Sequence, residues 1–309
     1  MSDIKMIRDI HTGEPKYYDF APQNKSFLLT ALELKELGIK NYYFCLEVKN
    51  PKSGVTEINP WNPNITAREI EVLMLELRAN LWFWSRTVTL LRTTKGIVPL
   101  ELNRGLAASY WCFLKHLDSL LCQPRQTYKT TGLIGGPIQW SFQLASNNGR
   151  IKFFGKDNTN TKNNIGHLAD DIDLLPEWLQ FKKYQDPHMV GKVKKAGRAT
   201  ETITNGLFGN KATITSKANS DSTALQIARG ESAETMYFDE VEFTLYFGKI
   251  LANSAPAFKT TSDNAKSVGN PTCRLLSSTP TADVIKVGGY TAMYGTNPLL
   301  IAGTHLEPK

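Results

Sequence analysis

The sequence is poor in the residues that build covalent or metal-based scaffolds. Its four cysteines, Cys45, Cys112, Cys122 and Cys273, form no C-x-x-C pair and show no zinc-ligand spacing. The five histidines likewise form no pair at helical spacing. Cys122 and Cys273 lie within apolar runs, so we expect buried free thiols, as in a protein of a reducing compartment.

Long apolar runs are also missing. No stretch approaches the roughly 20 residues that cross a bilayer, and the N-terminus lacks the pattern of a signal peptide. We therefore expect no membrane partner. The chain also lacks internal repeats and low-complexity tracts, and 41% of its 309 residues are hydrophobic, which is enough for one large core with an appendage.

The excess of positive charge is not spread evenly along the chain. The formal net charge is +7, and the segment from Lys182 to Arg198 has six basic residues and one acid, six minus one, or +5. A local excess of this kind favours contact with a polyanion, whereas a solvated lysine-rich loop explains the same charges equally well. The candidate contacts are Lys192, Lys194, Lys195 and Arg198.

Short apolar segments alternate with segments of helical periodicity along most of the chain. Strands are expected at residues 42–48, 120–122, 151–154, 211–216, 236–240 and 273–276. Helices are expected at residues 26–37, 66–91, 102–117, 133–142 and 161–175. We expect Gly135–Gly136–Pro137 to break or kink the fourth of these helices, because proline removes a backbone donor.

This alternation predicts an α/β fold with a mainly parallel central sheet flanked by helices. Three prolines in the loop at residues 50–64 predict a boundary in the chain. We therefore expect a helical N-terminal extension, residues 1–64, followed by one domain, residues 65–309.

The segment Leu120–Thr131, LLCQPRQTYKTT, combines an apolar strand, a loop and a Lys-Thr pair before a helix. This layout is typical of a phosphate-binding P-loop. Backbone N–H groups would face the phosphates, Lys129 would reach the β- and γ-phosphates, and the Thr130 hydroxyl would ligate Mg²⁺. Gln123 and Tyr128 stand where glycines are usual, so an ordinary turn is the alternative interpretation.

Two further apolar strands end in polar residues. Met236–Glu240, MYFDE, has the form of a Walker B strand, in which Asp239 would hold Mg²⁺ through water and Glu240 would polarise the attacking water. Cys273–Leu276 runs directly into the polar sequence SSTP. Because ligands of parallel sheets bind at the carboxyl ends of strands, all three motifs are placed for one site. Solvated acids at a strand end are the alternative for the two carboxylates.

These motifs resemble those of the large terminases of tailed phages, the motors that pump DNA into capsids. The run PRQTYKTT is similar to their deviant Walker A, MYFDE to their Walker B, and SSTP to their coupling motif. The segment Asp173–Gln180, DLLPEWLQ, resembles the family's LLP-x-aromatic-L segment, and Ala228–Arg229–Gly230 matches shortly before Walker B. The resemblance covers roughly residues 100 to 285.

The resemblance implies a P-loop NTPase fold and an ATPase that uses ATP and Mg²⁺ to move double-stranded viral DNA into a procapsid. It implies a portal protein and a small terminase subunit as partners, and a homo-oligomeric ring when active. The expected location is the host cytoplasm, at the portal vertex of the procapsid. Under this hypothesis the basic segment from Lys182 to Arg198 contacts DNA phosphates.

The resemblance also implies roles for individual side chains. Arg125 is the first candidate for an arginine finger and Arg229 the second, while Arg104 either contacts adenine or is a plain surface charge. The residues expected to contact the nucleotide are Gln123, Pro124, Arg125, Gln126, Thr127, Tyr128, Lys129, Thr130 and Thr131. The coupling motif, in which Thr279 would sense the γ-phosphate, consists of Ser277, Ser278 and Thr279.

Two other functions would use the same residues. A P-loop without its glycines could be a degenerate module that binds nucleotide or DNA without turnover, and a helicase-like enzyme would need a second motor domain. ATP turnover with and without double-stranded DNA separates these alternatives. We expect no nuclease activity, because residues 281–309 contain only two acids, Asp283 and Glu307, too few for a two-metal cluster.

Overall fold

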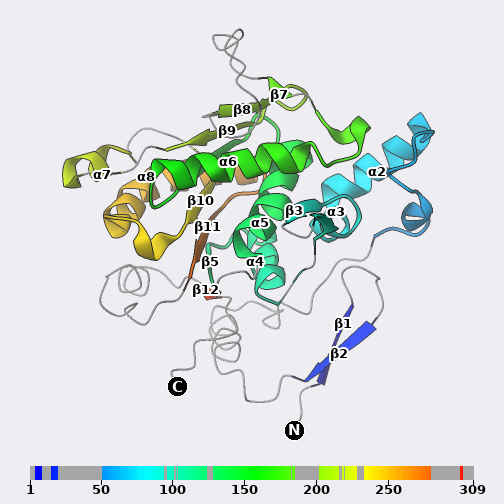
Figure 1. Cartoon of the computed structure of the whole chain (residues 1–309), viewed down its shortest axis with the longest axis horizontal. Coiled ribbons are helices and arrows are strands. Elements are labelled where there is room, and N and C mark those ends of the chain that lie inside the picture. Colours follow the sequence, from blue (N-terminus) through cyan, green and yellow to red (C-terminus); the bar gives the residue numbers. More distant parts are fainter. Residues whose placement is uncertain are drawn as a thin grey trace.

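The structure is a computed structural model in which the described part of the chain forms a sheet with helices on both faces (Figure 1). The described residues are 4–8, 15–19, 51–93, 96–100, 102, 104–123, 128–181, 183–184, 202–215, 218, 220–227, 233–279 and 300–301. No helix within these ranges is both long enough and apolar enough to cross a membrane.

Within the described part of the chain, the central sheet has eight strands. Their spatial order is β12 (Leu300–Ile301), β5 (Ser119–Cys122), β11 (Cys273–Ser278), β10 (Thr235–Asp239), β6 (Arg150–Phe154), β9 (Lys211–Ile214), β8 (Thr202–Asn205) and β7 (Lys183–Tyr184). The pairs from β12 to β9 are parallel, and the last two pairs are antiparallel. The predicted α/β fold with a mainly parallel sheet is confirmed.

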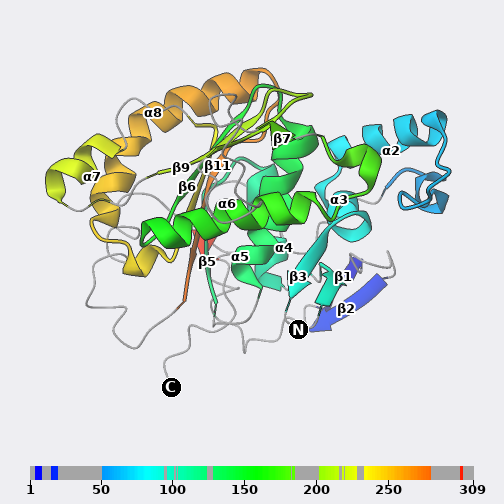
Figure 2. The same ribbon diagram turned by 45° about the horizontal axis from the view of Figure 1, so that its top comes forward.

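Helices cover both faces of the sheet. One side carries α4 (Arg104–Leu114), α5 (Lys129–Leu133) and α6 (Asn158–Ile172), with α2 (Ala67–Ala79) and α3 (Leu81–Thr87) packed beside them. The other side carries α7 (Asp221–Ile227) and α8 (Phe247–Ser267), and Figure 2 shows α8 across the sheet from α6. Short 3-10 turns lie at Val55–Glu57, Glu177–Leu179 and Val241–Phe243. Two hairpins, β1 (Ile4–Arg8) with β2 (Pro15–Asp19) and β3 (Leu90–Thr93) with β4 (Gly96–Pro99), lie apart from the sheet.

The apolar strands are buried from both sides, because successive side chains of a strand point to opposite faces. Leu121, Tyr237 and Leu275 pack in the core beneath α4 and α6. Their neighbours along the chain, Leu120, Phe238 and Leu276, belong to the second core beneath α8. The parallel register places Asp239 beside Ser277 and Ser277 beside Leu121, so the carboxyl ends of β5, β11 and β10 lie level with one another.

The long helix predicted for residues 66–91 is wrong in its second half. Its start is correct, since Thr66 and Glu69 form a capping box. The chain then leaves the helix at Asn80, whose side chain accepts from the Phe83 N–H at 3.1 Å and donates to Glu76 at 2.8 Å. Asn80 thus begins a second helix, α3, which ends at Thr87, and β3 follows where the last helical turn was expected.

The break or kink predicted at Gly135–Gly136–Pro137 is confirmed in part: the regular α-helix α5 ends at Leu133, but the chain does not leave the helical path. The chain stays helical through these residues as a π-helical turn, Ile134–Ile138, and a second π-helical turn follows at Ser141–Ala145. The wider π turn accommodates Pro137, which has no N–H to donate. Gly136 is required by packing, because a Cβ there would lie 1.7 Å from the Tyr110 hydroxyl, which donates to the Gly132 carbonyl at 2.5 Å.

Several other expectations have mixed outcomes. The strands at residues 120–122, 151–154, 211–216, 236–240 and 273–276, and the helices at residues 102–117 and 161–175, are confirmed within a few residues. Helix α8 and the strands of both hairpins were not predicted. The helix expected at residues 26–37 and the strand at 42–48 lie outside the described residues, and the boundary near residue 64 stays a prediction. Cys122 and Cys273 are buried free thiols, as expected.

Asp171 is an acid buried in α6, and its titration predicts how stability depends on pH. The side chain is 4% exposed, and burial, with a smaller contribution from Asp170, raises its pKa to about 8 against the opposing effect of Arg92. Between the unfolded pKa of 3.8 and about 8, the native protein keeps a proton that the unfolded chain releases. Rising pH in this window therefore favours unfolding, by up to about 1.4 kcal/mol per pH unit.

We therefore expect Asp171→Asn, which cannot ionise, to be more stable than the wild type by a margin that grows from pH 5 to pH 7. Urea unfolding of both proteins across this range measures that margin. Asp263→Asn makes the same chemical change on the exposed side of α8 and is the matched control. A constant difference between Asp171→Asn and wild type would show that Asp171 is ionised in the folded protein.

Candidate nucleotide-binding site

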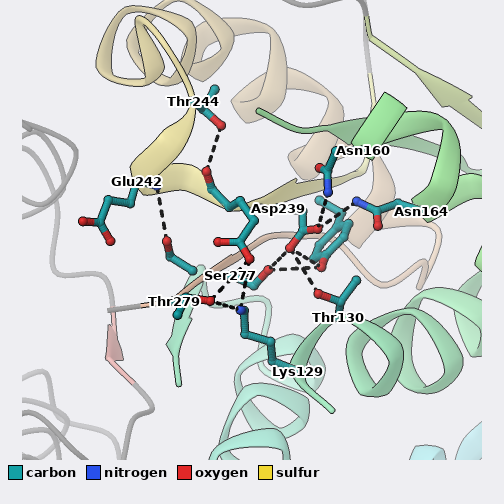
Figure 3. Close-up of polar contacts among 12 residues, drawn as sticks. Lys129, Thr130, Asn160, Asn164, Asp239, Glu242, Thr244, Ser277 and Thr279 are labelled. Carbon is teal, nitrogen blue, oxygen red and sulfur yellow. Dashed lines mark hydrogen bonds and ion pairs between the residues drawn. The ribbon is translucent and has the colours of Figure 1, made fainter. Parts of the chain in front are cut away.

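Three strand ends meet at one edge of the sheet and bring together the polar motifs of the sequence (Figure 3). Lys129 opens α5, which follows the loop after β5. Asp239 is the last residue of β10, and Thr279 directly follows the last residue of β11. Because β11 lies between β5 and β10, its end is in reach of both neighbouring motifs.

Lys129, Glu240 and Thr279 form a closed triangle of polar contacts. Lys129 is only 7% exposed, and its ammonium donates to Thr279 Oγ1 at 2.5 Å and to Glu240 Oε1 at 3.3 Å. The Thr279 hydroxyl lies 3.3 Å from the same carboxylate oxygen. The second carboxylate oxygen, Oε2, is buried and accepts no hydrogen bond from any described residue. The carboxylate of Glu240 thus contacts Lys129 and Thr279 through one of its two oxygens, and the other is left without a described donor.

Asp239 is surrounded by hydrogen-bond donors. Its carboxylate is 3% exposed, and Oδ1 accepts from the hydroxyls of Ser277 at 2.7 Å, Tyr237 at 3.2 Å and Thr130 at 3.2 Å. Its Oδ2 accepts from the side-chain amides of Asn160 at 3.2 Å and Asn164 at 3.1 Å. These donors come from four different elements, so the carboxylate joins α5, α6, β10 and β11.

Burial keeps the Tyr237 hydroxyl in its donor form. Its pKa is raised well above the usual value, first by burial and second by the nearby charge of Asp239. The phenol therefore stays protonated and can donate to Asp239 throughout the physiological pH range. The residue lies on β10, two positions before the carboxylate it contacts.

Tyr128 occupies the left-handed backbone conformation at the position where a P-loop usually has glycine. Its φ and ψ are 59° and 20°, and its carbonyl accepts from the Gly132 N–H at 2.7 Å as α5 begins. A non-glycine residue in this conformation costs about 1–2 kcal/mol. The backbone turn that glycine normally provides is thus present despite the missing glycine, and the Tyr128 side chain is 44% exposed.

The donor set fits a magnesium ion that arrives with phosphate groups. Mg²⁺ prefers oxygen ligands and is typically held by one or two carboxylates together with substrate phosphates and water. Thr130 supplies a hydroxyl and Asp239 a carboxylate, which lie 3.2 Å apart. Across the described residues no group of three or more His, Cys, Asp or Glu side chains could hold a metal by itself. The site therefore fits Mg²⁺ bound as part of a nucleotide complex.

The remaining predicted site residues are placed as follows. Gln123 is buried at the end of β5, where its N–H donates to the Ser278 carbonyl at 3.2 Å and its side chain fills the space left by Gly105. The Ser278 hydroxyl accepts from the Glu242 N–H at 3.3 Å. Thr131 lies one residue behind Thr130, and its hydroxyl donates to the Tyr128 carbonyl at 3.4 Å.

Other predicted site residues fall outside what the structure describes. Arg104 begins α4, but its side-chain position is not among the described features. The remaining loop residues, the second arginine-finger candidate and the DNA-contact candidates lie in undescribed segments: Pro124, Arg125, Gln126, Thr127, Arg229, Lys192, Lys194, Lys195 and Arg198.

Sequence reasoning missed three residues of the site, Asn160, Asn164 and Tyr237. The two asparagines are four residues apart on α6, a spacing that places both on one helix face. The two residues follow the carboxyl end of β6 in the sequence, so their spacing could have indicated that they lie at the site. Tyr237 was included in the Walker B strand but was interpreted only as an apolar strand residue.

Comparisons with known proteins give distant structural similarity. No family model matches the sequence, and no curated protein matches it. The large terminase of a thermophilic bacteriophage, bound to ATP-gamma-S, has a TM-score of 0.40 and 12% identity, over 62% of this chain and 41% of that one. With ADP bound to the same terminase the TM-score is 0.32 at 16% identity, over 62% and 41% of the two chains. The chain thus spans less than half the length of this terminase.

Proposed function

We propose that this chain binds ATP with Mg²⁺ and hydrolyses it at the carboxyl ends of β5, β10 and β11. The observation that carries the proposal is the contact of Lys129 with both Glu240 and Thr279. A buried lysine, a carboxylate and a hydroxyl from three separate motifs converge beside Asp239 and Thr130. Phosphoryl transfer needs this kind of arrangement, because it depends on positioning and on neutralising charge more than on covalent chemistry.

The contacts suggest how the site changes when ATP binds. The Lys129 ammonium balances Glu240 in the structure, and the phosphates of ATP would compete for the same ammonium. Lys129 transferred to the phosphates would release Glu240 to accept a hydrogen bond from the attacking water. Thr279 contacts both partners, so its position would report which of them Lys129 holds. Bound Mg²⁺, held by Thr130 and Asp239, would supply further charge neutralisation.

We further propose that the hydrolysis drives double-stranded DNA through a packaging motor of the large-terminase kind. The support is the set of motif resemblances in the sequence, namely the deviant Walker A, the Walker B and the SSTP run. In this proposal the basic segment Lys182–Arg198 contacts DNA phosphates, and the active form is a ring of identical chains. The portal protein and small terminase subunit are the proposed partners, at the portal vertex in the host cytoplasm. Arg125, with Arg229 as second candidate, is the proposed arginine finger.

Phosphate release from ATP, measured with and without linear double-stranded DNA, tests this function. We expect DNA to raise the rate, and we expect the triple substitution of Lys192, Lys194 and Lys195 by Glu to lose this stimulation while keeping the basal rate. Each lost phosphate contact should also reduce the salt slope of DNA binding by about 0.9.

The matched control replaces three lysines by Glu on another surface, the exposed side of α8: Lys249, Lys259 and Lys266. This control should respond to DNA like the wild type. If both triple variants lost the stimulation by DNA equally, the loss would be caused by the change in net charge and not by the segment Lys182–Arg198. An ATP hydrolysis rate that does not change when DNA is added would contradict the packaging role and would indicate an ATPase of another kind. Nucleotide binding without hydrolysis would identify a degenerate module.

A further inference from the structure

Asn160 and Asn164 approach Asp239 from α6, on the side away from Lys129 (Figure 3). Their side-chain amides donate to the same carboxylate oxygen, Oδ2, at 3.2 and 3.1 Å. The other oxygen, Oδ1, accepts only hydroxyl groups among the contacts of the described residues. The two carboxylate oxygens therefore have chemically different surroundings, which fix the orientation of the carboxylate about its own axis.

The asparagine contacts do not depend on the nucleotide loop. A carboxylate offers about four lone-pair sites, and five donors surround Asp239 in this structure. Thr130 is the one donor of this set that is also a proposed metal ligand; its hydroxyl would ligate Mg²⁺ through an oxygen lone pair and keep its proton for Asp239 Oδ1. The two amides belong to α6 and donate to Oδ2, whereas Thr130 belongs to α5 and donates to Oδ1, so the two sets of contacts share no acceptor atom.

Gly155 provides the space that Asn160 needs. A Cβ on Gly155, directly after β6, would lie 2.3 Å from Asn160 Oδ1, so a larger residue would displace the carboxamide. The Asn160 amide oxygen, Oδ1, is buried and accepts no hydrogen bond from the described residues. Because a carboxylate only accepts, the amide nitrogen must face Asp239, which turns the amide oxygen toward Gly155.

We infer that Asn160 and Asn164 are positioning residues that hold the Asp239 carboxylate in the orientation required to bind the metal of the ATP complex. The inference rests on the proposed function. Groups that orient a metal ligand typically change metal affinity by 10–100-fold when they are removed. We therefore expect weaker binding of the metal–nucleotide complex, with little change in the affinity for nucleotide alone.

The test is a titration of Mn²⁺ followed by electron paramagnetic resonance, with ATP-gamma-S present and no turnover required. Asn160→Ala and Asn164→Ala should each raise the Mn²⁺ dissociation constant by about 10–100-fold. Gly155→Ala should act in the same direction by displacing Asn160. Asn163→Ala, an exposed neighbour on the same helix, is the matched control and should bind Mn²⁺ like the wild type. ATP-gamma-S affinity measured in EDTA should be the same in all five proteins.

The outcomes separate this inference from the function on which it rests. Wild-type protein that binds no Mn²⁺ with ATP-gamma-S would overturn the proposed function, and the inference with it. Wild-type binding together with unchanged Mn²⁺ affinity in the folded Asn160→Ala and Asn164→Ala proteins would overturn the inference alone. Loss of native circular dichroism in both variants would make the contacts purely structural and would also overturn it.

Discussion

Replacing Glu240 with Gln is expected to reduce ATP hydrolysis by about 10²–10⁴-fold, the usual contribution of a positioned acid–base group. Glutamine keeps the shape of the side chain, and its amide oxygen can still accept from Lys129 and Thr279, which both contact Glu240 Oε1. What is lost is the negative charge that polarises water. The same charge competes with phosphate for the Lys129 ammonium, so we expect nucleotide affinity to stay equal or to rise.

Steady-state phosphate release measures the first effect, and titration with a fluorescent ATP analogue measures the second. Glu177→Gln makes the same chemical change at an exposed position and should leave both quantities unchanged. Glu240→Gln that turns over ATP at the wild-type rate would exclude Glu240 from catalysis and would leave it as a structural partner of Lys129.

The Lys129→Ala protein is expected to lose nucleotide affinity rather than turnover alone. The ammonium is a buried cation that contacts Glu240, and truncating one member of a buried charged contact typically costs about 2–5 kcal/mol. We therefore expect a fall in ATP affinity of roughly 10²-fold or more, because each 1.4 kcal/mol is a factor of ten. The fall should be larger for ATP than for adenosine, which has no phosphate to bind.

The competing interpretation is that Lys129 only neutralises Glu240. In that case Lys129→Ala would lower the free energy of unfolding, because Glu240 would lose its cation, and nucleotide affinity would be unchanged. The double variant Lys129→Ala/Glu240→Gln distinguishes the two roles. If Lys129 binds phosphate, the double variant stays deficient in nucleotide binding. If Lys129 only balances charge, the second substitution restores the stability lost in the first.

Much of the site follows from local sequence signals. The strands before Gln123, before Glu240 and before Ser277 are short apolar runs, and each ends where polar residues begin. Two-sided burial in a parallel sheet makes such runs easy to locate. Because parallel strands end at one edge, the meeting of Lys129, Asp239 and Thr279 could be expected from the order of these motifs along the chain.

The rest of the structure depends on contacts between distant residues. The helical path continues through Pro137 as a π turn, and the glycine before it, Gly136, is required by contact with Tyr110, 26 positions earlier in the chain. From the sequence pattern, Asn80 is expected to be one polar residue within a long helix. In the structure its side-chain hydrogen bonds with Glu76 and Phe83 place it at the boundary between α2 and α3. Asn160 and Asn164 are recognised as site residues only through their hydrogen bonds to Asp239, which lies 75 or more positions away in the chain.

The most direct measurement is the number of phosphate ions released per chain when the protein is mixed with excess ATP, Mg²⁺ and linear double-stranded DNA. The Glu240→Gln protein, purified in parallel, corrects for contaminating ATPases. The proposed site predicts many phosphates per wild-type chain and a rate for Glu240→Gln lower by at least about 10²-fold. No release by a wild-type protein that binds ATP, or equal release by the two proteins, would contradict hydrolysis at the site formed by Lys129, Asp239 and Glu240.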